Sequence, residues 1–206
     1  MAATPNPRPD PWANRDVDVR RGGDAYGPFL AAFRELQDAV SRSDPPAEIW
    51  EQMVGPVREM TSALDSWAAP ERQQPAGTRR DLPGRGHPFL VPFSAIDSDE
   101  SMVRGRVTFR RFHLGGNGAA HGGAIPLLFD EVLGHLCNAG DRPVARTARL
   151  TINYRQITPL ELELQVEARF ERQEGRKRWL SASLTSGATV VADAEGLFVE
   201  LRPGQP

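Results

Sequence analysis

The clearest pattern in the chain is a strict alternation of apolar and polar residues over 160–171. The apolar positions are Leu160, Leu162, Leu164, Val166, Ala168 and Phe170, and those between them are Glu161, Glu163, Gln165, Glu167, Arg169 and Glu171. Successive side chains of a β-strand point to opposite faces, so a period of two predicts a strand with one buried face and one wet face. Shorter runs predict five more strands, over about 89–96, 102–109, 145–157, 176–187 and 189–201.

Between the second and third of these predicted strands lies a segment, 122–138, that is apolar nearly all round. Its apolar residues are Ile125, Leu127, Leu128, Phe129, Val132, Leu133, Leu136 and Cys137. A helix of this kind is buried, and an antiparallel meander needs a partner that covers its apolar face. We therefore expect an α+β domain over 89–201 in which an antiparallel sheet wraps around a central helix.

The N-terminal part predicts two amphipathic helices. The first, over 26–40, has an apolar stripe of Phe29, Phe33, Leu36 and Val40, with Asp24 as the candidate cap. The second begins at Pro45, with Ser43 or Asp44 as its cap, and ends near Trp67. Its stripe is Trp50, Met53, Val54, Val57, Met60, Leu64 and Trp67, and Gly55-Pro56 is expected to kink it.

Such a stripe must pack on something, and the main domain is the first expectation. A partner surface, a lid over a ligand channel and an oligomer contact are the alternatives.

Composition then divides the chain into five segments. They are a disordered arm (1–24), a helical segment (25–69), a Pro- and Gly-rich linker (70–88), the main domain (89–201) and a tail (202–206).

Charge and cysteine content exclude several classes of protein. The net charge is −2, which supplies no basic field for nucleic acid or an anionic membrane. Cys137 is the single cysteine, so neither an internal disulfide nor a multi-cysteine metal site can form. No stretch approaches the roughly 20 apolar residues that span a bilayer, and the N-terminus lacks a signal-peptide core. We expect a cytoplasmic protein.

Two features carry candidate chemistry. The glycine-rich loop 115–123 opens the predicted central helix, where free backbone N–H groups bind an anion or an oxyanion. Asp130 lies in the middle of that apolar helix, where burying a carboxylate is costly unless the group is paired or used. A turn chosen for its backbone shape and an ion pair across an interface are the structural alternatives, but the combination favours catalysis without a metal or cofactor.

Three segments, HGGAIPLLFD, LTINYRQITPLELEL and EGRKRW, resemble the PaaI-like and THEM-type acyl-CoA thioesterases of the hotdog superfamily. The resemblance covers roughly residues 89–201 and implies a hotdog fold and a role in acyl-CoA and fatty acid metabolism. In one respect the chain departs from the PaaI-like pattern. An asparagine usually stands six residues before the histidine, and Gly115 stands there in this chain. Either Asn117 substitutes for it, or the role is absent as in THEM-type members.

The resemblance also implies roles for individual residues. The Gly122 N–H polarises the thioester carbonyl, Asp130 acts as general base or nucleophile, Thr147 helps hold the attacking water, and His121 shapes the loop. Coenzyme A binding is implied for four other residues: Asn153, Arg155, Arg176 and, more weakly, Ser181.

Strand parity adds that Thr147, Asn153 and Arg155 share one face, with Ala148, Leu150, Ile152 and Tyr154 on the other. A solvated hairpin tip is the competing explanation for Arg176 to Arg178. His87 and His113 are expected in solvent.

Helix geometry adds that one chain cannot complete the site. Eight helical residues separate Gly122 from Asp130, about 12 Å at 1.5 Å per residue. Two helices running antiparallel across a two-fold axis would bring these groups together, which predicts a homodimer or a dimer of dimers.

We expect hydrolysis of acyl-CoA to a carboxylic acid and free CoA. A non-catalytic acyl-CoA sensor and a hotdog enoyl-CoA hydratase are the alternatives. The Asp130 to His135 spacing is similar to the hydratase motif, but its intervening Asn-Pro is missing, so His135 is expected to pack in the core.

Overall fold

The computed structural model describes residues 20–202 and 204 in two compact units that meet in the sequence at Pro88 and Phe89. Most of the predicted arm and tail lies outside the described residues. Among those described, no helix is both long enough and apolar enough to cross a membrane. The two units are described separately below.

The first unit is helical. Its two long helices are α1 (Tyr26–Arg42) and α2 (Ala47–Asp65), and two 3-10 turns follow, η1 (Glu71–Gln73) and η2 (Pro83–Gly86). Neither predicted cap forms, because the cap positions are Ala25 and Pro46, without side-chain hydrogen bonds. Two prolines in a row explain the late start of α2, since a residue before proline avoids the helical region.

One face of α1 is held by the segment that contains η2. The Arg34 guanidinium, which is buried, donates to the carbonyls of Pro83 and His87 at 3.3 and 3.1 Å. The Tyr26 hydroxyl donates to the carbonyl of Gly86 at 2.6 Å. These contacts fix α1 within its unit through a face other than its apolar stripe.

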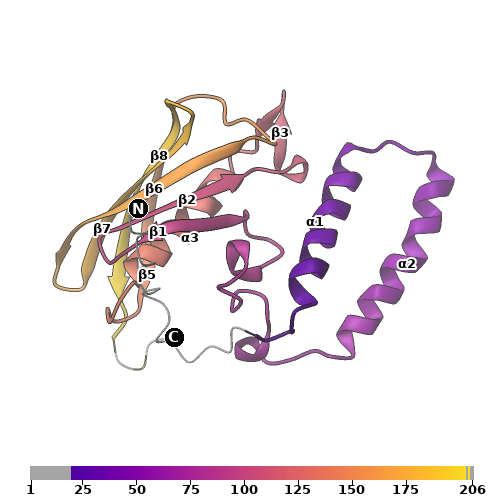
Figure 1. Ribbon diagram of the computed structural model, residues 1–206, viewed down its shortest axis with the longest axis horizontal. Helices are drawn as coiled ribbons and strands as arrows, with labels where there is room; N and C mark the ends of the chain where they lie inside the picture. Colours follow the sequence, from indigo (N-terminus) through magenta and orange to yellow (C-terminus); the bar gives the residue numbers. More distant parts are fainter. Residues whose placement is uncertain (1–19, 203, 205–206) are drawn as a thin grey trace, which may run out of the picture. The chain divides into compact units, whose positions relative to one another are not determined.

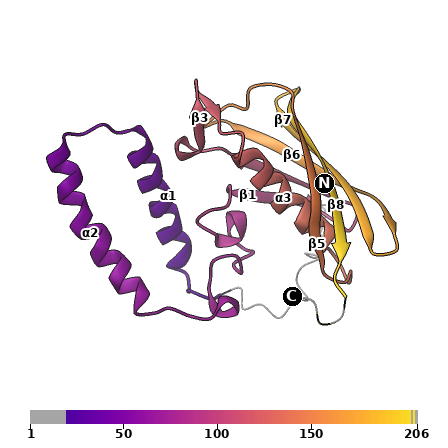
Figure 2. The ribbon, with the colours of Figure 1, turned by 180° about the vertical axis from the view of Figure 1, so that it is seen from behind.

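The second unit is a six-stranded antiparallel sheet packed against one long helix (Figures 1 and 2). The strand order is β1-β2-β6-β7-β8-β5. The strands are β1 (Phe93–Ser98), β2 (Met102–Thr108), β5 (Ala145–Tyr154), β6 (Glu163–Glu174), β7 (Lys177–Ser186) and β8 (Thr189–Glu200). A 3-10 turn, η3 (Arg111–His113), and a small hairpin of β3 (Leu114–Gly116) and β4 (Ala119–Ala120) precede the helix, α3 (Ala124–Cys137). The predicted fold class is confirmed.

The core lies between α3 and the sheet. Leu128, Phe129 and Leu133 of α3 are at most 1% exposed, as are Leu164 and Val166 of β6. Gly196 of β8 allows the close approach, because a Cβ there would lie 3.0 Å from the side chain of Leu133. The alternation over 160–171 therefore predicted the buried face of β6 correctly.

Three local predictions are wrong. The first strand begins at Phe93, four residues late, and β6 begins at Glu163, after Glu161 with a positive φ of 59°. Leu162 is consequently exposed. His113 is buried, and its Nδ1 accepts the Arg110 backbone N–H at 2.9 Å, because η3 folds the ring against Phe112.

Candidate active site

Asp130 and Thr147 form the centre of the candidate site. Asp130 lies in the middle of α3, and the Thr147 hydroxyl, on β5, donates to its Oδ1 at 2.7 Å. Both residues are exposed in the single chain. The premise that Asp130 is buried is therefore wrong, because the face of α3 beside β5 is not covered by the sheet. The carboxylate faces outward at an open edge instead, oriented by the Thr147 hydroxyl.

A β-bulge in β5 explains how Thr147 reaches α3. In the pairing with β8, Thr147 lies opposite Phe198 and Arg149 lies opposite Leu197, so Ala148 has no partner of its own. One extra residue reverses the parity of the strand beyond it. The prediction that Thr147 shares a face with Asn153 and Arg155 is therefore wrong, since Thr147 faces the helix and the other two lie on the opposite face.

The glycine-rich loop presents one free donor at the start of α3. The Gly123 N–H donates to Nδ1 of His121 at 2.9 Å, and the Ala124 N–H donates to the carbonyl of His121. The Gly122 N–H has no acceptor among the residues that the structure describes, and Gly122 is exposed. His121 therefore orders the loop, and Gly122 keeps a donor available for an oxyanion.

Tyr154 holds the other side of the same loop and was missed by the sequence reasoning. Its hydroxyl donates to the carbonyl of Gly122 at 2.8 Å, from the end of β5. The alternation along the strand predicted that Tyr154 lies on the same face as Leu150 and Ile152. This prediction is the sequence feature that could have indicated the contact. The tyrosine fixes the orientation of the glycine residue whose N–H is free.

The missing family asparagine has a steric explanation. A Cβ at Gly115 would lie 2.6 Å from the Cα of His121, so no side chain fits there. Asn117 and Gly118 form the two-residue turn between β3 and β4, with φ of 50° and 75°. Asn-Gly with positive φ at both positions is typical of a type I′ hairpin, so the turn by itself accounts for Asn117.

Asn153 and Arg155, the predicted coenzyme-binding pair, meet at Asp193 of β8. The Asn153 amide donates to Oδ1 at 2.6 Å and the Arg155 Nε donates to Oδ2 at 2.6 Å. These donors hold the pKa of Asp193 below its ordinary value, Arg155 having the larger effect. The sequence alone does not indicate Asp193, because its position opposite Asn153 depends on the register in which β5 pairs with β8.

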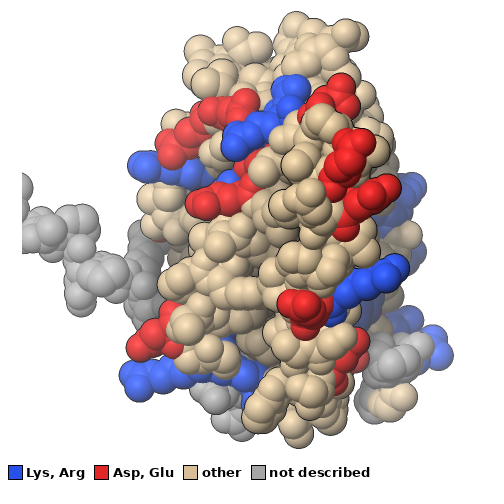
Figure 3. Space-filling model, turned by 90° about the vertical axis from the view of Figure 1, so that its right-hand side faces the viewer, with Lys and Arg blue, Asp and Glu red and all other residues tan. Residues whose placement is uncertain are grey.

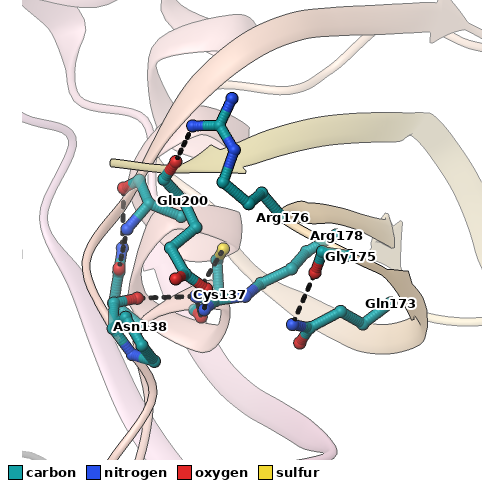
Figure 4. Close-up of polar contacts among 9 residues, drawn as sticks. Cys137, Asn138, Gln173, Gly175, Arg176, Arg178 and Glu200 are labelled. Atoms are coloured by element: carbon teal, nitrogen blue, oxygen red, sulfur yellow. Dashed lines mark hydrogen bonds and ion pairs between the residues drawn. The ribbon is translucent and has the colours of Figure 1, made fainter. Parts of the chain in front are cut away.

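Arg176 and Ser181 make separate contacts on the sheet. The Arg176 guanidinium donates to the carbonyl of Glu200 at 2.8 Å, and the Ser181 hydroxyl donates to the carboxylate of Glu171 (Figure 4 shows Arg176). Arg176 is exposed and Ser181 is half-buried. Among the described residues, no hydrogen bond links either of them to Asp130.

Arg178 is not part of a solvated hairpin tip, because its side chain is fully buried. It donates to the carbonyls of Cys137 and Pro143 at 3.1 and 2.8 Å and to the carboxylate of Glu200 at 3.0 Å (Figure 4). A cation at the last turn of α3 interacts favourably with the helix dipole. Burial also raises the pKa of the neighbouring Cys137 thiol. Arg178 thus fixes the C-terminal end of the helix that carries Asp130.

The described residues include no cluster of three or more His, Cys, Asp or Glu side chains arranged to hold a metal. The fold and this site define a hotdog domain with an exposed carboxylate and a free helix-entry N–H. Comparisons with known proteins agree. The thioesterase superfamily model matches residues 117–178, which include most of the loop and all of α3, β5 and β6. The hotdog domain is therefore similar, over these residues, to the proteins of the thioesterase superfamily.

Relatives by sequence are acyl-coenzyme A thioesterase THEM4 proteins. The chain is 37% identical to that of Mus musculus over 133 residues, which is 63% of this chain and 55% of the relative. It is 35% identical to that of Bos taurus over 88 residues, 42% of this chain and 35% of the relative. The chain thus spans about half, or less, of these relatives' lengths.

Solved structures share the fold. A crystal structure of a thioesterase superfamily protein is 27% identical and has a TM-score of 0.74, covering 86% of this chain and 92% of that one. The matched share of this chain is larger than the share that the hotdog unit makes up, so this match extends into the helical unit. The PaaI protein of E. coli, at 19% identity and a TM-score of 0.51 over 54% of this chain and 81% of that one, shows the fold alone.

Proposed function

We propose that this protein is an acyl-CoA thioesterase that hydrolyses the thioester to a carboxylic acid and free CoA. The observation that carries the proposal is the pairing of an oriented carboxylate, Asp130, with a free helix-entry donor, the Gly122 N–H. A thioester needs both an activated nucleophile and a stabilised oxyanion. The THEM4 relatives, which are named as acyl-coenzyme A thioesterases, support the same reaction.

In the proposed reaction the thioester oxygen accepts the Gly122 N–H, which stabilises the negative charge that develops on it. Asp130 takes a proton from water, whose oxygen attacks the carbonyl carbon. The C–S bond then breaks, and the proton passes from Asp130 to the departing thiolate. Direct attack by the carboxylate, through an anhydride that water opens, uses the same group in the same place. Thr147 orients the carboxylate in either route.

We further propose that two chains build each site. Along one helix Gly122 and Asp130 are separated by about 12 Å, too far to act on one carbonyl. Asp130, Thr147, Gly122 and Tyr154 are all exposed beside β5, the edge strand of the sheet. A long open edge is a ready template for pairing with a second chain. An antiparallel arrangement about a two-fold axis would place Gly122 of one copy near Asp130 of the other.

Arg155 is the best-supported contact for the coenzyme phosphates. Asp193 accepts from its Nε at 2.6 Å and, more weakly, from its Nη2 at 3.5 Å, which holds the side chain in place. Within the described part of the chain, the Nη1 donors have no acceptor. A guanidinium presents donors in a fixed fork that suits phosphate oxygens. Asn153 steadies the same carboxylate, and Arg176 is a second candidate from the β6–β7 turn.

The experiment that tests the function is thiol release from a panel of short, medium, long and aromatic acyl-CoAs. A thioesterase accumulates free CoA thiol with at least one of them. A hydratase converts an enoyl-CoA without releasing thiol, and a binding module holds acyl-CoA without turnover. Either of these last two results would overturn the proposal, and the preferred acyl group would begin to define the pocket.

A further inference from the structure

The helical unit carries an apolar surface that the proposed function does not use. We call it the hairpin stripe. It consists of twelve side chains that are 36% to 84% exposed. They are Phe29, Phe33, Leu36 and Val40 of α1, and Ile49, Trp50, Met53, Val54, Val57, Met60, Leu64 and Trp67 of α2 and the turn that follows it. No residue of α2 is buried.

The stripe has the spacing of a packed helix bundle. In α2 and its following turn, the positions 50, 53, 57, 60, 64 and 67 are separated alternately by three and four residues, the a and d positions of a heptad. The flanking e and g positions include Ile49 and Val54, so the apolar face is wider than a two-stranded seam needs. The four stripe residues of α1, at positions 29, 33, 36 and 40, follow the same spacing.

The charges of α2 point to the kind of partner. All five charged residues fall on the outward b, c and f positions: Glu48, Glu51, Arg58, Glu59 and Asp65. Figure 3, turned so that the α2 side of Figure 1 faces the viewer, shows uncharged surface between separate groups of charged side chains. Charges at e and g positions set partner choice and orientation, and like charges there would repel, but α2 has no charged residue at these positions. Two copies of this helix can therefore meet without like-charge repulsion.

The hairpin itself leaves the stripe open. Residues 43–46 join α1 to α2, and the two helices run antiparallel and stand apart (Figures 1 and 2). Twelve large side chains at these exposures present on the order of 1,000 Å² of apolar surface, well above the largest patch on a typical monomer. One partner in a standard interface contributes about 800 Å². The area thus suits a stable contact with one second copy.

We propose that α1 and α2 of two copies of this chain pack together as a four-helix bundle, with the hairpin stripe at its centre. Such a contact is isologous, since each copy presents the same surface to the other. Two-helix hairpins that associate antiparallel around a and d positions form bundles of this kind. The proposal does not depend on the thioesterase reaction.

Sedimentation velocity of the full chain over a range of concentrations tests the proposal. The variant Met53→Glu/Met60→Glu puts two charges into the stripe. Its matched control, Gln52→Glu/Ser62→Glu, adds the same two charges to the outward face of α2. All four side chains are exposed, so neither variant should disturb the fold of a single chain. We expect the wild type and the control to associate with similar affinity. In the stripe variant the association constant should be about 100-fold lower.

A distance measurement separates this contact from any that the hotdog units make. A spin label at Ser62→Cys lies on the outward face of α2, while Cys137 is buried and its raised pKa protects it from labelling. Two labels in one bundle should lie within about 40 Å, since packed helices are 8 to 10 Å apart. We expect this distance to disappear in the stripe variant. The same distance in the labelled stripe variant as in the labelled, otherwise wild-type chain, together with identical sedimentation of the stripe variant and its control, would overturn the proposal.

Discussion

At the scale of single residues, the site is organised by three short contacts around α3. Thr147 orients Asp130, His121 accepts the Gly123 N–H, and Tyr154 holds the Gly122 carbonyl. Among the described residues, the first contact leaves the second carboxylate oxygen of Asp130 without a donor. The other two order the loop and leave the Gly122 N–H without an acceptor. The two positioning hydroxyls can be tested separately.

Replacing Thr147 by valine removes a hydroxyl and keeps the shape of the side chain. A hydrogen bond to a charged group contributes about 1.5 to 3 kcal/mol, so we expect kcat for thiol release to fall by about 10-fold or more. Thr147→Ser, which keeps the hydroxyl, should stay within about 3-fold of the wild type. Equal kcat values for the two variants would show that the hydroxyl does not position Asp130.

Tyr154→Phe removes only the hydroxyl that holds the Gly122 carbonyl. Losing an oxyanion donor outright costs 10²- to 10³-fold, and a donor that is merely less well oriented should cost about 10-fold in kcat. Because the effect is on the transition state, KM should change little. The kinetic parameters for a single acyl-CoA measure this, and a change confined to KM would assign Tyr154 to substrate binding instead.

At the scale of elements, the pairing of β5 with β8 places the groups of the site. The bulge at Ala148 turns Thr147 toward α3, and the regular register beyond it brings Asn153 opposite Asp193. Arg178 anchors the far end of α3 to β7 and β8. Two predictions test these links.

The pair of Asp193 and Arg155 should stabilise the fold in a pH-dependent way. Because the folded pKa of Asp193 lies below its ordinary value of 3.8, the contribution is fully present above that value and is lost as pH falls through the lowered pKa. Asp193→Asn should therefore lower the free energy of unfolding more at pH 7 than at pH 2. Solvent screens the pair, so the difference should be small. An equal loss at both pH values would contradict this.

Arg178→Leu should destabilise the protein strongly. It removes a buried cation from two carbonyls and from Glu200, and breaking such a network typically costs 3 to 5 kcal/mol. Arg176→Leu, two residues away and exposed, should cost less than about 1 kcal/mol. Urea unfolding of both variants measures the difference, and equal losses would mean that the buried contacts of Arg178 contribute nothing specific.

At the scale of the whole molecule, much of the fold follows from sequence because it depends on periodicity. The alternation over 160–171 and the apolar helix over 122–138 correspond to β6 and α3, and the family motifs indicate the same hotdog domain. Features that depend on register or close approach could not be predicted. The bulge at Ala148, the contact at Gly115 and the burial of Arg178 each depend on a neighbour that is distant in sequence.

Asp130 is exposed in the single chain, although the sequence predicts it to be buried. An apolar helix predicts burial on all sides, yet the face beside edge strand β5 is open in the single chain. A single sequence does not show which face of a helix stays open. We propose that a second chain covers this face and completes the site.

The most direct test of the account compares Asp130→Asn with Glu131→Gln, its neighbour on α3, in thiol release from the best acyl-CoA substrate. Each variant removes one negative charge from the same helix, and circular dichroism checks that both remain folded. We predict that kcat/KM falls by at least about 100-fold for Asp130→Asn and by less than about 5-fold for Glu131→Gln. Retention of wild-type kcat/KM by a folded Asp130→Asn would contradict the account.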